Sequence, residues 1–209
     1  NLPIQIDETA GILFLFAQYY KKFRENSILN EFYDDLVKPT ANFLVDFCGE
    51  NDLPKPNYEL WEMDFLSTTY STSVVFAALY SASKLAQAAN RVHDAKKWLE
   101  QALKIRSSAQ NELFNEESNY FYRGIWADGN KDPKIDSSSF YGAFMFNLFE
   151  FKGEKLQTAF KTLENRFKAN DNIGLPRFEN DIYYRFSDDY EANIWPITTL
   201  WRAEFYIAL

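Results

Sequence analysis

Two glutamates stand on either side of a tryptophan in the segment NYELWEMDFLSTTYST, residues 57–72. Glycosidic bonds are cleaved by two carboxyl groups: one protonates the leaving oxygen, and the other activates water or attacks the sugar. An apolar neighbour such as Trp61 could desolvate Glu59 or Glu62 and raise its pKa, as a general acid requires. Acid pairs beside an aromatic residue also occur on ordinary helix surfaces. Taken alone, this segment favours a helix start with surface charge.

Two other polar segments could add groups to a sugar site. The first holds Gln5 and Asp7 ahead of a strongly apolar stretch, where capping of a helix is the simpler explanation. The second contains Arg177, Asp181 and Trp195, which are residue types that hydrogen-bond sugar hydroxyls or stack on sugar rings. A surface loop held by salt bridges would have a similar composition.

The charge of the chain argues against a nucleic-acid partner. There are 22 basic and 30 acidic residues, which gives a net charge of −8, and no basic run is longer than a pair. Nucleic-acid binders present a basic stripe to the phosphate backbone. No apolar stretch approaches the roughly 20 residues that span a bilayer, so no membrane segment is predicted.

Cysteine and histidine each occur once, as Cys48 and His93. One cysteine cannot form an internal disulfide, and the two residues together argue against a zinc site or a Ser-His-Asp triad. Carboxylates therefore become the expected catalytic groups. A single cysteine suits a cytoplasmic protein and is also compatible with secretion.

Apolar residues at helical spacing predict one helix after another, without alternating strands. Pro39 predicts a break near Lys38, and Pro196 fits the first turn of a final helix. The region 115–135 is rich in turn residues and predicts a loop or a short hairpin. This pattern indicates an all-α protein with paired antiparallel helices and functional loops at one end. The expected helices cover residues 7–23, 27–48, 68–90, 94–114, 136–151, 153–167 and 194–209. Asp7 or Glu8 is expected to start the first of these helices, and Asp94 to cap the fourth.

Four segments, taken in order, resemble motifs of the catalytic domain of glycoside hydrolase family 15, the glucoamylases and their relatives. A Gln-x-Asp motif is matched at residues 5–7, and a Tyr-Asp-Leu-Trp-Glu-Glu motif at residues 58–63. A Lys-x-Asp-Ala/Ser-Ser motif is mirrored at residues 134–138. An Arg-Tyr-x-x-Asp-x-Tyr-Tyr motif with a following Asn-Pro-Trp corresponds to residues 177–195.

The resemblance implies an (α/α)6 toroid whose loops form a pocket for the non-reducing end of an α-glucan or a related oligosaccharide. Such enzymes release glucose with inversion and need no cofactor or metal. Carried over residue by residue, the general acid is Glu62. The expected contacts to substrate or pocket walls come from Glu59, Trp61, Gln5, Asp7, Arg177, Asp181 and Trp195.

Three residues depart from the motifs. Glu59 stands where the family usually has Asp, Met63 replaces the second Glu of the Glu-Glu pair, and Ile194 replaces a proline. The family's general base lies on a Glu-Gln motif that would follow Leu209. We therefore expect residues 1–209 to be the central part of a larger catalytic domain. Residues 1–209 on their own should be inactive. A sugar-binding or regulatory module without catalysis, or a plain helical scaffold, are the alternatives.

Overall fold

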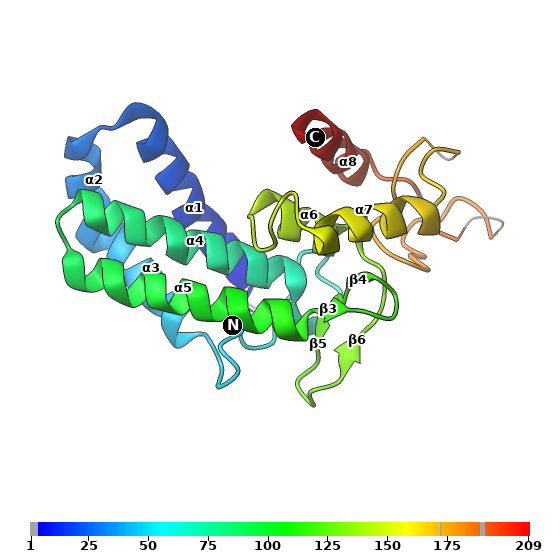
Figure 1. Ribbon diagram of the computed structural model, residues 1–209, viewed down its shortest axis with the longest axis horizontal. Helices are drawn as coiled ribbons and strands as arrows, with labels where there is room; N and C mark the ends of the chain where they lie inside the picture. The colour runs from blue at the N-terminus through cyan, green and yellow to red at the C-terminus, as the bar shows by residue number, and fades with distance from the viewer. Residues whose placement is uncertain (1–3, 172, 189–190) are drawn as a thin grey trace.

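The computed structural model of the protein describes residues 4–171, 173–188 and 191–209. Within these residues eight α-helices follow one another, with only short strands between them, which confirms the all-α prediction. Figure 1 shows α1, α4 and α5 side by side in one half of the molecule, with α6, α7 and α8 in the other. The helices are α1 (Ile6–Phe23), α2 (Asn26–Phe32), α3 (Lys38–Asp46), α4 (Thr69–Ala88), α5 (Val92–Glu112), α6 (Ser137–Met145), α7 (Glu154–Arg166) and α8 (Pro196–Ala208).

Helix α4 is the centre of the core and contacts α1, α5 and α6. Fourteen of its twenty residues are buried, many of them Ala, Ser or Thr, whose small side chains let neighbouring helices approach closely. The hydroxyl of Thr68 accepts a hydrogen bond of 3.0 Å from the Ser71 N–H and caps the start of the helix. This fixes the end of α4 that follows the Glu59–Glu62 segment.

The predicted break at Pro39 takes the form of a widened turn. A π-helical segment, Tyr33–Val37, joins α2 to α3, and Pro39 lies in the first turn of α3. A proline in a helix offers no N–H to the carbonyl four residues back, and an extra residue in the preceding turn accommodates the loss. Pro196 begins α8, as predicted.

Among the described residues, short strands form two small sheets. The sequence predicted only one part of them, a possible hairpin within residues 115–135. The larger sheet is antiparallel in the order β1-β2-β5-β6, and β5 and β6 form that hairpin. Gly124 allows the close approach of β5 to β2, because a Cβ there would lie 2.5 Å from the Ser67 carbonyl oxygen. The strands are β1 (Asn57–Tyr58), β2 (Phe65–Thr68), β3 (Phe114–Asn115), β4 (Tyr120–Phe121), β5 (Gly124–Ile125) and β6 (Lys131–Asp132).

Two predicted helix caps are wrong. Helix α1 begins after Gln5 without a side-chain cap, and the carboxylate of Asp7 points instead to Ser71 on α4. Asp94 lies inside the first turn of α5, where it accepts a 3.0 Å hydrogen bond from the Tyr33 hydroxyl. Both carboxylates thus accept hydrogen bonds from residues distant in sequence instead of capping a helix. Among the described helices, none combines the length and the apolar character needed to cross a bilayer.

Candidate active site

The segment between β1 and β2 is a turn built around the carboxylate of Glu59. This side chain is 2% exposed and accepts hydrogen bonds from three backbone N–H groups, those of Trp61 at 2.7 Å, Met63 at 3.0 Å and Asp64 at 3.3 Å. The Glu62 N–H donates to the Glu59 carbonyl at 2.8 Å. The turn, residues 59–64, is therefore held from inside by Glu59.

Glu62 lies at the exposed tip of this turn. Its φ is +58°, a left-handed conformation that costs a residue with a Cβ about 1–2 kcal/mol. Such strain persists only where the surroundings fix it, and it concentrates at functional positions. The turn thus presents the Glu62 side chain to solvent while Glu59 remains buried beneath it.

Trp61 connects the turn to α6 and α8. Its indole Nε1–H donates to both carboxylate oxygens of Asp136, at 3.0 and 3.2 Å. Its ring lies 5.9 Å from the ring of Trp201, which in turn stacks on Tyr141 at 4.3 Å. The sequence did not single out Trp201 or Tyr141, because apolar helical spacing explains both of them equally well.

Arg177 brings the last polar segment to the same place. Its guanidinium pairs with Asp181 through two hydrogen bonds, and it lies over the rings of Trp61 at 5.4 Å and Trp195 at 4.7 Å. It also lies 3.8 Å from the sulfur of Met63, one of the three residues that depart from the family motifs. Residues more than a hundred positions apart in sequence therefore meet beside the turn.

Gln5 and Asp7 lie beneath the turn. The Gln5 amide donates to the Glu59 carbonyl at 3.5 Å, and the Ser71 hydroxyl donates to the Asp7 carboxylate at 3.2 Å. Burial raises the pKa of Asp7 to about 6, with smaller contributions from the charges of Glu8 and Glu59, although the hydrogen bond from Ser71 opposes the shift. All eight site residues expected from the sequence thus gather around one turn.

Asp136 is a site residue that the sequence motif contained but that we did not select. It is 1% exposed and caps α6 by accepting hydrogen bonds of 2.7 Å from the N–H and the hydroxyl of Ser138. Burial raises its pKa to about 6, although Ser138 and Arg123 oppose this shift. Its position in the Lys-x-Asp-Ser-Ser motif was the available signal.

Arg123 is a further residue that sequence reasoning missed. This buried arginine pairs with Asp132 at 2.8 Å and with Asp64, the last residue of the turn. It comes from the turn-rich region 115–135, where nothing in the local pattern distinguishes it. Its two ion pairs connect the turn, through Asp64, to strand β6 of the four-stranded sheet, through Asp132.

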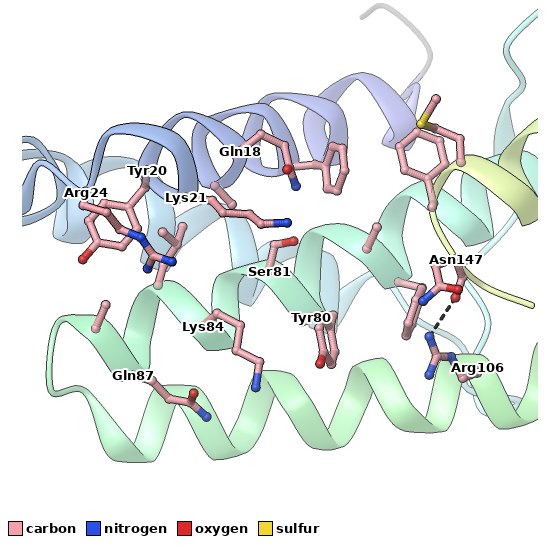
Figure 2. A pocket seen from close by; sticks show the side chains of 18 residues that line it. Gln18, Tyr20, Lys21, Arg24, Tyr80, Ser81, Lys84, Gln87, Arg106 and Asn147 are labelled. Carbon is pink, nitrogen blue, oxygen red and sulfur yellow. Dashed lines mark hydrogen bonds between the residues drawn. The ribbon is translucent and has the colours of Figure 1, made fainter. Parts of the chain in front are cut away.

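A separate groove of about 820 Å³ runs along the second halves of α1 and α4, away from this turn. Figure 2 shows Lys21, Arg24, Lys84 and Arg106 around it, and no carboxylate is among its lining residues. Glycoside cleavage requires carboxyl groups, so this groove is not the hydrolytic site. Among the described residues, no cluster of His, Cys, Asp and Glu side chains could hold a metal ion.

The segments between the helices thus bring together carboxyl, arginine and tryptophan side chains, which are the groups that proteins use to bind and cleave glycosides. The sequence model of the glycosyl hydrolases family 15 matches residues 3–209. The chain belongs to this family.

Solved structures show the same fold. A bacterial glucoamylase complexed with acarbose is 20% identical, with a TM-score of 0.76, and covers 99% of this chain. A glycosidase in complex with glucose is 16% identical, with a TM-score of 0.77 and the same coverage. A rhamnosidase from Klebsiella oxytoca with rhamnose bound is 12% identical over 78% of this chain, with a TM-score of 0.62.

The chain spans only part of these structures: 33% of the glucoamylase, 49% of the glycosidase and 31% of the rhamnosidase. At these identities the likeness concerns the fold alone, which is that of the glucoamylase-type toroid. A search of curated protein sequences finds no match.

Proposed function

We propose that this chain is the central part of an exo-acting, inverting glycoside hydrolase that releases glucose from the non-reducing ends of α-glucans or related oligosaccharides. The observation that carries this proposal is the position of Glu62, exposed at the tip of a turn that is tied to Trp61 and Arg177. In the mechanism, Glu62 protonates the glycosidic oxygen as the leaving group departs.

The water-activating base belongs to a part of the catalytic domain outside residues 1–209. Inversion places the two carboxyl groups roughly 6.5–9.5 Å apart, so that one water molecule fits between the base and the sugar. The left-handed backbone of Glu62 and the hydrogen bonds beneath it keep the acid in a fixed place for this geometry.

Arg177, Asp181, Trp61 and Trp195 support sugar binding in this proposal. Tryptophan rings offer flat apolar faces for stacking, and the arginine and aspartate offer donors and acceptors for hydroxyl groups. Trp195 is partly exposed beside Arg177, and its indole Nε1 has no hydrogen-bond partner among the described residues. This N–H remains available to a ligand oxygen after a small rearrangement of the side chain.

Glu59, Gln5 and Asp7 contribute differently. The family resemblance assigned Glu59 to sugar hydroxyls, but its carboxylate accepts three backbone hydrogen bonds within its own turn. These bonds support a role in holding Glu62 in place. Gln5 bonds to the turn from below, and Asp7 bonds to Ser71 beside it. These contacts support the resemblance's expectation that the two residues shape the wall of the sugar pocket.

Binding of acarbose, the ligand of the bacterial glucoamylase structure, tests the proposal. We expect acarbose to quench the tryptophan fluorescence of the chain saturably, and we expect no glucose release from maltose by the chain alone. Arg177→Lys should weaken binding, because an ammonium group cannot replace the two-pronged guanidinium. The matched control, Arg185→Lys at a partly buried position outside this cluster, should bind as the wild type does. Absence of any saturable binding would contradict the proposal.

A sugar-binding module without catalysis is the second candidate. It is favoured by Met63, whose sulfur faces Arg177 at the position where the family motif carries its second glutamate. The distinguishing experiment is glucose release by the full-length gene product and its Glu62→Gln variant. Turnover lost in Glu62→Gln supports the hydrolase, whereas acarbose binding without turnover in the wild type supports the module.

A further inference from the structure

We propose that Asp136 is a positioning residue that acts through the indole of Trp61 to fix the orientation of the turn at residues 59–64, and thereby of Glu62. This inference rests on the function proposed above for Glu62. It goes beyond that function because Asp136 itself contacts neither the tip of the turn nor, in this proposal, the substrate.

The anchor is rigid. Asp136 begins α6, and its Oδ1 accepts hydrogen bonds from the N–H and the hydroxyl of Ser138, both at 2.7 Å. The Tyr120 hydroxyl donates to its backbone carbonyl at 2.8 Å. With its side chain and main chain both held, the carboxylate is fixed relative to α6 and β4. A fixed acceptor can orient a donor that reaches it from a loop.

Trp61 transmits this position to the turn. Its Nε1–H reaches both oxygens of Asp136, while its backbone N–H donates to the Glu59 carboxylate at 2.7 Å. The side chain is thus fixed at its far end by α6 and at its near end by the turn. Glu62 is the next residue, so rotation of the Trp61 backbone would move the Glu62 side chain directly.

The charges around Asp136 allow its protonation to be followed. Arg123, from the strand region, favours the ionised form, while Glu59 in the turn and the apolar surroundings oppose it. The Tyr120 hydroxyl faces the backbone carbonyl of Asp136 from β4. A protonated carboxyl group accepts the indole N–H less strongly than a carboxylate does. The Trp61 indole proton should therefore report the titration of Asp136, whose pKa burial raises to about 6.

Nuclear magnetic resonance of the indole N–H signals tests the link without any ligand. The Trp61 signal, assigned by its loss in Trp61→Phe, should shift with a midpoint near pH 6 and should not shift in Asp136→Asn. The Trp98 indole, which donates to Asn42 at 3.2 Å, is an internal reference that should not follow this titration. A Trp61 signal that titrates alike in the wild type and in Asp136→Asn would overturn the inference.

Amide hydrogen exchange tests whether the link positions the turn. The backbone amides of Met63 and Asp64 donate to the Glu59 carboxylate, so their exchange reports opening of the turn. In Asp136→Asn these amides should exchange about tenfold faster, because loss of the hydrogen bond to a charged carboxylate lowers the free energy needed to open the turn. Asparagine still caps a helix well, so α6 should persist in this variant. The control is Asp128→Asn, which changes an exposed aspartate that takes no part in these contacts, and exchange in the turn should stay unchanged there.

A double-mutant cycle tests whether Asp136 acts on the turn through Trp61. If Asp136 acts through Trp61, the variant with both Asp136→Asn and Trp61→Phe should exchange no faster at Met63 than the more affected single variant. Independent, multiplying effects of the two substitutions would overturn the inference. The same cycle read by acarbose affinity separates the two proposals. A wild type that fails to bind acarbose contradicts the proposed function, whereas the exchange cycle still decides the role of Asp136.

Discussion

The guanidinium of Arg177 and the carboxylate of Asp181 form two hydrogen bonds, of 2.7 and 2.8 Å, in a place where both side chains are almost entirely buried. The aromatic rings of Trp61, Tyr183 and Trp195 surround this arginine at 4.7–5.4 Å. The pair thus joins the segment before α8 to the turn that carries Glu62.

Removal of one partner of this pair should strongly destabilise the fold. Arg177→Ala leaves the Asp181 charge buried without its partner, which typically costs about 3–5 kcal/mol of unfolding free energy. Urea denaturation measures the change. The control is Arg185→Ala, whose partner Asp188 is exposed, so its unfolding free energy should not change measurably. Equal effects of the two variants would contradict the buried-pair interpretation.

The two tryptophans beside Arg177 should respond differently to the same substitution. Trp61→Phe removes a hydrogen bond to a carboxylate and should cost about 1.5–3 kcal/mol of unfolding free energy, whereas Trp195→Phe removes no such bond. Both changes remove similar volume, so their difference isolates the hydrogen bond. Thermal or urea unfolding of the two variants provides the comparison, and a larger loss in Trp195→Phe would refute it.

Glu62→Gly should stabilise the protein while removing the proposed acid. Glycine adopts φ of +58° without the penalty of about 1–2 kcal/mol for other residues, and its greater freedom in the unfolded chain offsets about 0.5–1 kcal/mol of that gain. We therefore expect a small rise in the melting temperature. Glu117→Gly, in an exposed turn, has no such strain to relieve and should lower it. A drop in stability for Glu62→Gly would show that the Glu62 side chain itself stabilises the turn.

Loss of the proton from Asp7 should lower the free energy of unfolding as the pH rises from about 4 to 6. Burial raises its pKa from 3.8 to about 6, so the folded state holds the proton more tightly than the unfolded state does. The advantage is complete below the unfolded pKa and is lost as the pH passes the folded pKa, a change of ~3 kcal/mol. Asp7→Asn should flatten this part of the stability profile. Asp128→Asn, in an exposed loop, should leave it as in the wild type.

The sequence was sufficient to predict most of the helices. Helix periodicity depends on local spacing, so most helix boundaries and the effects of the prolines could be predicted within a few residues. The exception is the helix predicted over residues 136–151, because α6 ends at Met145. The strands could not, because each is two to four residues long and pairs with a segment elsewhere in the chain, as β2 does with β5. Asp7 and Asp94 were misjudged as caps for a related reason, since distant partners took their carboxylates.

The sequence by itself predicted carboxylates as the groups for acid–base work, since His93 and Cys48 each stand alone, and the family motif that it resembles made Glu62 the candidate acid. Only the tertiary structure decided the arrangement around that glutamate. It placed the Glu59 carboxylate inside the turn and brought Asp136 to the indole of Trp61. The physical reason is that burial and hydrogen-bond partners are set by residues distant in sequence. The Trp61–Asp136 contact, across 75 positions, is one that local spacing does not encode.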